Sequence, residues 1–184
     1  MEQIGLTIAW LADASHWSGA NGIPTRLSEQ VAISGISLLI ALALALPLGS
    51  WVGHTGRGTT LVVNAANLWR ALPSLAVIAI VLPITAALDP QAGFRVYPTV
   101  VAMVVLGVPP ILVNTYSGLA QVDRDTREAA RGQGMTGVQL FNRVELPLAM
   151  AVIVTGVRSA AVQIIATATL GAIFGFGGLG RYLV

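Results

Sequence analysis

The chain contains no lysine, no cysteine and very little charge of any kind. Without cysteine there is no disulfide framework, no thiolate metal site and no cysteine nucleophile. Without lysine there is no phosphate-binding loop of the G-x-x-x-x-G-K-[ST] type, so this chain has no such site for ATP hydrolysis. Only 10% of the 184 residues are charged, against about a quarter in a soluble domain. The scarcity of charge argues against a one-domain cytosolic enzyme.

Apolar residues fill the space that charge leaves empty. They make up 55% of the chain, and the mean hydropathy is +0.77, so the surplus apolar surface must face lipid. The pI near 9.7 would suit nucleic acid, but the arginines are scattered between long uncharged runs rather than clustered on a polar face. We therefore expect an all-α integral membrane protein with no nucleic-acid partner.

Chemistry-bearing motifs are equally scarce. His16 and His54 stand alone, H-E-x-x-H is missing, and no paired aspartates or serine–histidine arrangement falls within the apolar runs. We therefore predict no catalytic residue, no metal site and no cofactor held by this chain.

Four windows are long and apolar enough to cross a bilayer, which takes about 20 residues. The first is preceded by Ser28, a candidate N-cap, and the second contains Arg70. The windows are Val31 to Val52, Thr59 to Leu88, Tyr97 to Val122, and a stretch from Pro147 that carries Arg158 and fades into the glycine-rich residues 171–180. The sequence thus predicts four transmembrane helices.

Arg70 leaves the start of the second helix open. A helix that begins at Thr59 carries Arg70 to mid-membrane, whereas Ala71 to Leu88 is uncharged and long enough for a short span by itself. We prefer the second alternative, in which Arg70 marks the cytoplasmic end of the helix.

Residues 1–28 precede the predicted spans and form a segment of their own. Ile4, Ile8 and Leu11 fall on one side of a helix, and Trp10 and Trp17 suit headgroup depth. We expect a short interfacial helix on the outer side of the membrane, with a partly ordered tail as the alternative.

Arginine placement predicts the orientation of the chain. Cytoplasmic connections of membrane proteins carry an excess of basic residues. One side would hold Arg57, Arg124, Arg127, Arg131 and Arg143, and the other Arg26, Arg95 and Arg181. Five against three puts the N-terminus outside and the connection before Pro147 in the cytoplasm.

That connection, residues 123–146, is the one long polar stretch. Asp123 or Asp125 is placed to cap a short helix through Ala130, which Gly132 and Gly134 then stop. The pairs Asp123/Arg127 and Arg124/Glu128 are spaced i,i+4 to support this helix.

A second short helix is expected after the glycines. Thr136 is placed to cap it, with Val138 and Phe141 on one face, and Pro147 is tolerable in the first turn of the next membrane helix. The alternative is an ordinary solvated loop.

The order and spacing of this stretch carry a family resemblance. The sequence from Glu128 to Pro147 is similar to the EAA motif of the permease subunits of bacterial binding-protein-dependent ABC importers, which we call the EAA motif here. The matching positions are Glu128, Ala129, Ala130, Gly134, Leu146 and Pro147. The segments 114–119 and 167–182 resemble the osmoprotectant branch of that family, the glycine betaine, carnitine, choline and proline importers.

The resemblance implies the type I ABC importer permease (MetI-like) fold, with residues 29–184 as the permease domain and the EAA motif as a coupling helix on an ATPase. It also implies a second, identical or related permease subunit, a solute-binding protein outside the bacterial cytoplasmic membrane, and ATP and Mg on the ATPase. Such permeases usually continue into one more hydrophobic helix, so the C-terminal helix is expected to be missing from this chain.

Several residues within the predicted spans are candidates for the translocation pathway. Pro109-Pro110 must break the hydrogen-bond ladder of the third helix, and the bend would turn Asn114 and Tyr116 toward a passage, unless it is only an architectural kink. Arg158 lies about 16 Å past Pro147, near mid-membrane, where a lipid-facing charge costs at least ~2.5 kcal/mol. We expect Arg158 to face a polar cavity or a partner, or else to snorkel to the interface.

The predicted function is ATP-driven import of a small osmoprotectant. The alternative within the class is an importer of another small solute such as an amino acid. From a different class, the alternative is a secondary transporter or channel, which would place acidic or histidine relays in its helices.

Overall fold

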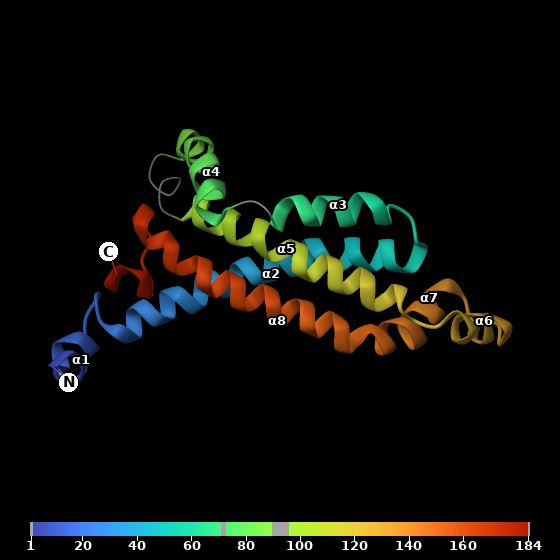
Figure 1. Ribbon diagram of the computed structural model, residues 1–184, viewed down its shortest axis with the longest axis horizontal. Helices are drawn as coiled ribbons and strands as arrows, with labels where there is room; N and C mark the ends of the chain where they lie inside the picture. Colours follow the sequence, from blue (N-terminus) through green and yellow to red (C-terminus); the bar gives the residue numbers. More distant parts are fainter. Residues whose placement is uncertain (1, 71–72, 90–95, 184) are drawn as a thin grey trace.

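The computed structural model describes residues 2–70, 73–89 and 96–183, and every regular element in them is helical (Figure 1). The α-helices are α1 (Glu2–Ala12), α2 (Ile23–Thr55), α3 (Thr59–Arg70), α4 (Ser74–Leu88), α5 (Tyr97–Ala120), α6 (Arg124–Gly132), α7 (Gly137–Leu140) and α8 (Leu146–Leu170). Short turns are η1 (Ala14–Trp17), η3 (Gly171–Phe174) and η4 (Leu179–Tyr182), and η2 (Phe141–Glu145) is a π-helical turn that joins α7 to α8.

Three helices form the body of the molecule. α5 lies between α2 and α8 and packs along both of them, and Figure 1 shows the three running lengthwise together. Their shared core includes Ile33, Met103, Ile111 and Ile164, all 5% exposed or less. Three helical stretches in the described part of the chain are long and apolar enough to cross a membrane: Ile23–Thr55, Tyr97–Ala120 and Gly137–Phe174.

The second predicted window folds as two helices rather than one span. α3 has 12 residues and α4 has 15, both below the roughly 20 needed to cross a bilayer. Both pack against α5. The preferred short span begins at Ala71, which lies outside the residues that the structure describes. The backbone of Arg70 ends α3, and its side chain is likewise outside the described part. The count of four spans stays a prediction.

The first membrane helix begins earlier than expected. The predicted N-cap at Ser28 is wrong, because α2 starts at Ile23 and its N-cap is Gly22. Pro24 lies in the first turn, where its fixed φ and missing N–H suit a helix start. Ser28 lies inside the helix and its hydroxyl donates to the Thr25 carbonyl at 2.7 Å.

The double proline does not end the third membrane helix, since α5 runs from Tyr97 to Ala120 with both prolines inside it; the predicted loss of ladder hydrogen bonds holds at the two proline nitrogens, which have no hydrogen to donate. Prolines are tolerated in membrane helices where neighbouring helices and side chains satisfy the freed backbone groups. Both prolines are buried between neighbouring helices. The carbonyls that lose their helical donors are those of Val105 and Leu106, four residues before the prolines, while the Asn114 side-chain amide donates to the carbonyl of Pro110 at 2.7 Å. The double proline is therefore built into a packed helix.

Glycines let the three long helices approach closely. A Cβ at Gly156 of α8 would lie 2.6 Å from the Asn114 Cβ and 2.8 Å from the Pro110 carbonyl oxygen of α5. A Cβ at Gly49 of α2 would lie 2.8 Å from the Thr115 Cβ. Small residues at such crossings are typical of membrane helix pairs, because packing replaces the hydrophobic driving force there.

The glycine-rich segment after α8 is a turn fixed to the start of α2. The Glu29 carboxylate accepts hydrogen bonds from the Gly178 N–H at 2.7 Å and from the Arg26 guanidinium at 2.9 Å. The Tyr182 hydroxyl donates to the Asn21 carbonyl at 2.7 Å. Since Gly178 has φ +75°, it occupies a conformation that other residues rarely adopt.

Candidate functional site

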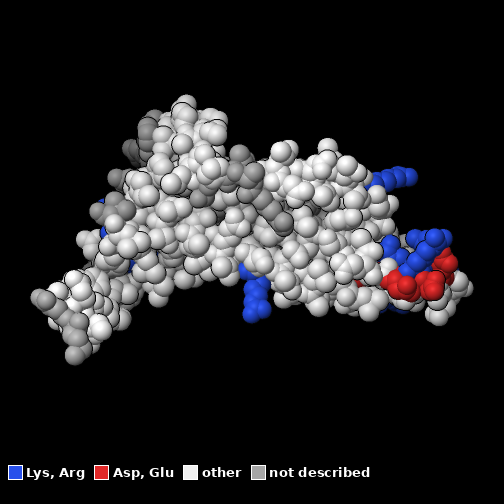
Figure 2. Space-filling model, in the orientation of Figure 1, with Lys and Arg blue, Asp and Glu red and all other residues white. Residues whose placement is uncertain are grey.

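Charged side chains gather at one end of the molecule, around α6. Figure 2 shows both signs packed together there, while most of the rest of that face is uncharged. The Asp123 carboxylate caps α6 by accepting the Thr126 N–H at 3.0 Å. Of the two predicted caps, Asp123 is therefore the one used.

One of the two predicted ion pairs on α6 forms. The Arg124 and Glu128 side chains meet at 2.7 Å, with 87% and 58% of them exposed. The predicted Asp123/Arg127 pair is wrong. Arg127 instead turns inward, because a buried carboxylate, Glu145, lies on the inner side of α6.

The turn after α6 is sharp, as the glycines predict. α6 ends at Gly132, and Gly134 has φ +81° with its N–H donating to the Arg131 carbonyl at 2.9 Å. A left-handed residue after a helix is the usual way to end it, and glycine adopts it without strain. No heavy atom of the described residues lies within 4 Å of a Cβ built at Gly134.

The second short helix starts where expected but does not stand apart. The Thr136 hydroxyl accepts the Gln139 N–H, and the Gln139 side chain accepts the Thr136 N–H, which completes a capping box. α7 has only four residues and passes through η2 directly into α8. Val138 is exposed while Phe141 is half-buried.

The predicted EAA residues divide between surface and interior. Glu128, Ala129 and Gly134 are exposed, and Pro147 is exposed in the first turn of α8. Ala130 is buried, so its small size serves packing within the chain rather than contact with a partner. Leu146 is half-buried.

Glu145 is not among the predicted site residues, yet it lies at the centre of this end of the molecule. Its side chain is fully buried, and its Oε2 lies 2.5 Å from Nδ1 of His54 at the end of α2. Its Oε1 lies 3.2 Å from Nε of Arg127, an ion pair whose angle falls short of a hydrogen bond. The Phe141 ring meets the His54 ring edge-on at 5.7 Å. We call Glu145, His54 and Arg127 the Glu145 cluster.

A signal for this cluster exists in retrospect. Glu145 directly precedes a long apolar helix, and a buried carboxylate is almost always paired. The candidate partners are 91 residues away at His54 and 18 residues away at Arg127 in the sequence, so spacing could not identify them.

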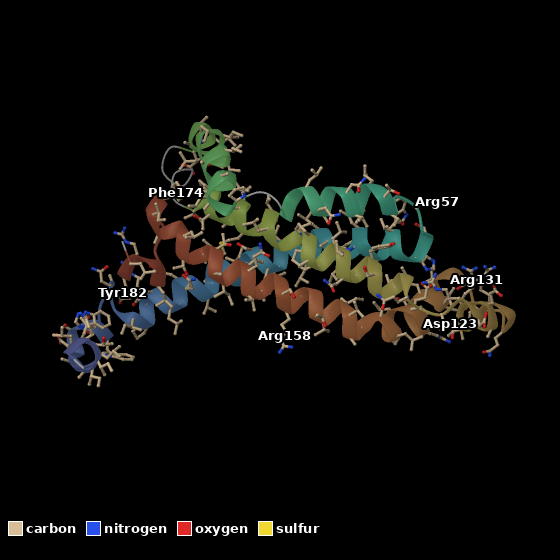
Figure 3. All side chains as sticks on the ribbon, viewed as in Figure 1. Arg57, Asp123, Arg131, Arg158, Phe174 and Tyr182 are labelled. Carbon is tan, nitrogen blue, oxygen red and sulfur yellow. The ribbon has the colours of Figure 1, made fainter. Side chains whose placement is uncertain are left out.

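The predicted pathway residues do not come together in one place. Pro110 and Asn114 lie in the contact between α5 and α8, whereas Pro109 is buried and Tyr116 half-buried elsewhere on α5. Arg158 is exposed and points away from the other helices (Figure 3). It has no ion pair with any other residue that the structure describes.

Polar side chains lie beside Arg158 on the outer face of α8, together with the exposed Val154 and Val162 one turn before and after it. Thr155, Ser159 and Gln163 are all exposed there. The Thr155 and Ser159 hydroxyls donate to the carbonyls four residues earlier, at 2.9 and 3.0 Å, which satisfies the hydroxyls within the helix. Together Arg158 and these three polar residues make a polar stripe on an otherwise apolar helix, which we call the α8 stripe.

Comparison with known proteins adds the family context. Residues 45–184 match the family model described as binding-protein-dependent transport system inner membrane component. The chain is similar to the permease protein OpuCB of a glycine betaine/carnitine/choline transport system of Bacillus subtilis, with 35% identity over 86% of this chain and 70% of that protein. It is similar to the choline transport permease protein OpuBB of the same organism, with 36% identity over 84% of this chain and 68% of that protein.

A third relative and a solved structure are consistent with this family match. The osmoprotectant import permease protein OsmW of Salmonella typhimurium is 34% identical over 94% of this chain and 80% of that protein. A chain of the MetNI methionine ABC transporter, solved in an inward-facing conformation, superposes with a TM-score of 0.76 over 87% of this chain and 77% of that chain. At 21% identity, that likeness shows the fold.

Proposed function

The chain belongs to the family of binding-protein-dependent transport system inner membrane components, and on that basis we propose that it is the transmembrane permease subunit of an ATP-driven osmoprotectant importer. The observation that carries the proposal is the polar block 123–146, a capped helix, a glycine turn and a second cap at one end of an apolar helical body. The relatives named above are transport permease subunits, which points to a transport role rather than a catalytic one.

The exposed part of the block is the proposed docking surface for the ATPase. Glu128 and Ala129 are exposed on α6, and Gly134 is exposed at the turn. A carboxylate beside a small residue and a tight turn allow a partner to approach the backbone closely. ATP and Mg would be bound by the ATPase, two copies of which would dock on the cytoplasmic side.

Cysteine cross-linking tests this docking surface. The chain has no cysteine of its own, so Ala129→Cys introduces a single thiol. We expect a short thiol cross-linker to join this variant to the ATPase subunit in membranes. Ser15→Cys, in η1 at the other end of the molecule, serves as the control and should not join to it. Equal cross-linking of both variants would contradict the proposed surface.

The remaining partners and the orientation follow from the same proposal. A solute-binding protein would deliver solute at the opposite end, where the N-terminus lies, and the block 123–146 would face the cytoplasm of a bacterial inner membrane. A second permease subunit, identical or related, would complete the pathway.

The α8 stripe is the proposed lining of that pathway or of the contact with the second permease. Arg158 faces no polar cavity of this chain among the residues described, and a lipid-facing charge near mid-membrane costs at least ~2.5 kcal/mol. Both facts favour a position at a boundary that another subunit completes. The other predicted pathway residues would then support α8 from α5, which packs along it. They are Pro109, Pro110, Asn114 and Tyr116.

Thiol accessibility distinguishes a pathway from lipid. We expect Arg158→Cys in the assembled transporter to react with a water-soluble thiol reagent at least tenfold faster than Leu39→Cys, an exposed apolar position midway along α2. Equal, slow labelling of the two positions would place Arg158 away from water.

The solute is proposed to be a small osmoprotectant of the glycine betaine, choline, carnitine or proline type, because the named relatives carry solutes of that kind. Competition for uptake of labelled glycine betaine into vesicles with ATP and the binding protein tests this. Unlabelled choline or carnitine should reduce uptake, and methionine should not. Competition by methionine alone would favour the amino-acid alternative.

A further inference from the structure

We infer that the Glu145 cluster is the internal connection that transmits movement of α6 to the membrane helices α2, α5 and α8. This inference rests on the proposed function, because it concerns how ATP-driven movement reaches the pathway. Glu145, His54 and Arg127 would then be positioning residues for transport, although none of them touches solute or ATP.

The cluster joins three helices at one carboxylate and reaches a fourth through Arg127. His54 lies in the last turn of α2, Arg127 lies in α6, and Glu145 is the last residue before α8. Arg127 also donates from a terminal nitrogen to the carbonyl of Leu119, near the end of α5, at 2.5 Å. A single arginine therefore contacts both the buried carboxylate before α8 and the backbone of α5.

Burial makes this connection stiff. Glu145 is fully buried, and removing one partner of a buried charge is strongly unfavourable because the remaining charge is left unpaired. The exposed Arg124–Glu128 pair on the outer side of α6 gains little by comparison, since water replaces either partner. A movement that pulled Arg127 away from Glu145 would leave Oε1 of the buried carboxylate without its ion-pair partner, with His54 still at Oε2, so α6 is held to the membrane helices.

Few other side chains of α6 are placed to share this task. Ala130 is the buried residue of α6 and Arg127 is half-buried, while the other side chains of the helix are exposed. On the far side of the turn, η2 carries Glu145 directly into α8. The chain joins the block 123–146 to α5 at Asp123 and to α8 at Glu145, and the Arg127–Glu145 ion pair adds a direct link between its first helix and the residue that precedes α8.

The experiment measures solute uptake and ATP hydrolysis in the same vesicles, which hold the permease, its ATPase and its solute-binding protein. We expect Arg127→Gln and Glu145→Gln each to lower the amount of solute moved per ATP by tenfold or more, while basal ATP hydrolysis per assembled transporter changes less than twofold. The double variant should fall no further than the worse single variant, because both changes break the same contact.

Arg57→Gln is the matched control. Arg57 is an exposed arginine in the turn between α2 and α3, near the end of the molecule that carries α6 (Figure 3), and it has no ion pair with another described residue. Removal of its charge should leave the solute-to-ATP ratio within twofold. Arg127→Lys should give an intermediate ratio, because lysine keeps the charge but does not have the fork that reaches both Glu145 and Leu119.

The outcomes separate the inference from the proposed function. Absence of ATP-driven uptake by the wild-type chain would overturn the proposed function itself. Coupled wild-type transport with an unchanged ratio in Arg127→Gln would overturn the inference alone. If Glu145→Gln fails to insert into the membrane, Arg127→Gln and Arg127→Lys still test the inference, because Arg127 is only half-buried. A merely structural role would lower uptake and ATP hydrolysis together with the amount of transporter, so the solute moved per ATP would stay constant.

Discussion

The turn at Gly134 provides a sharp test of the block 123–146, because two neighbouring glycines there differ in backbone conformation. Gly134 has φ +81°, whereas Gly132 ends α6 and is not among the glycines with positive φ. In neither place does a heavy atom of the described chain lie within 4 Å of an added Cβ. A change to alanine therefore tests backbone conformation with no steric clash inside the chain.

The expected magnitudes follow from the two conformations. Alanine in the left-handed region costs about 1–2 kcal/mol, which shifts the population of the turn by a factor of about 5–30. Alanine at Gly132 removes the entropic penalty of a helical glycine and stabilises α6 by up to about 1 kcal/mol. We expect Gly134→Ala to lower ATP-driven uptake about fivefold or more, and Gly132→Ala to leave it within twofold.

A graded series identifies the cause. Asparagine tolerates the left-handed conformation better than alanine, and valine tolerates it worse. Uptake per assembled permease in vesicles should therefore decrease in the order Gly134→Asn, Gly134→Ala, Gly134→Val. Equal loss in all three variants would refute backbone conformation as the cause and indicate exclusion by the ATPase surface instead. Normal uptake by Gly134→Val would refute the need for this turn.

Three further predictions concern stability and local order. Gly156→Ala should lower the Tm of the solubilised permease, because overpacking costs about 1–3 kcal/mol. Gly35→Ala should not lower the Tm, since the space around its Cβ is open in the described structure. Equal Tm values for the two variants would contradict the close α5–α8 contact. Asp123→Ala should destabilise α6 by about 1 kcal/mol because the helix loses its N-cap, and the amide hydrogens of α6 should then exchange faster. Asp125→Ala should destabilise α6 less. The reverse order would mean that Asp125 is the cap. Glu29→Gln weakens the charge-assisted hydrogen bond from the Gly178 N–H, so a protease should cut the glycine-rich turn faster. An unchanged cleavage rate would show that other contacts hold the turn.

Local features of the site could be predicted from the sequence because their signals are local. The caps at Asp123 and Thr136 and the turn at Gly134 each depend on residues within four positions of one another. The i,i+4 spacing gave Arg124/Glu128 correctly but also gave Asp123/Arg127, which does not form. A buried carboxylate attracts Arg127 more strongly than an exposed one, and the burial of Glu145 is a tertiary fact.

Tertiary packing also explains the errors in the fold. The double proline of α5 lies in an unbroken helix, where both prolines are buried and the Pro110 carbonyl lies close to Gly156 of α8. The second apolar window divides into α3 and α4, and the polar residues Asn64, Asn67 and Arg70 all lie in α3. Hydropathy reports how much surface avoids water, and it does not report where a helix stops.

Uptake of labelled glycine betaine into vesicles, with single omissions, tests the central claim most directly. The complete set contains the permease, its ATPase subunit, the solute-binding protein and ATP. We predict uptake with the complete set and at least tenfold less when ATP, the ATPase subunit or the binding protein is left out. Undiminished uptake without the ATPase subunit, driven by an ion gradient or by the solute gradient alone, would contradict the account and favour a secondary transporter or channel.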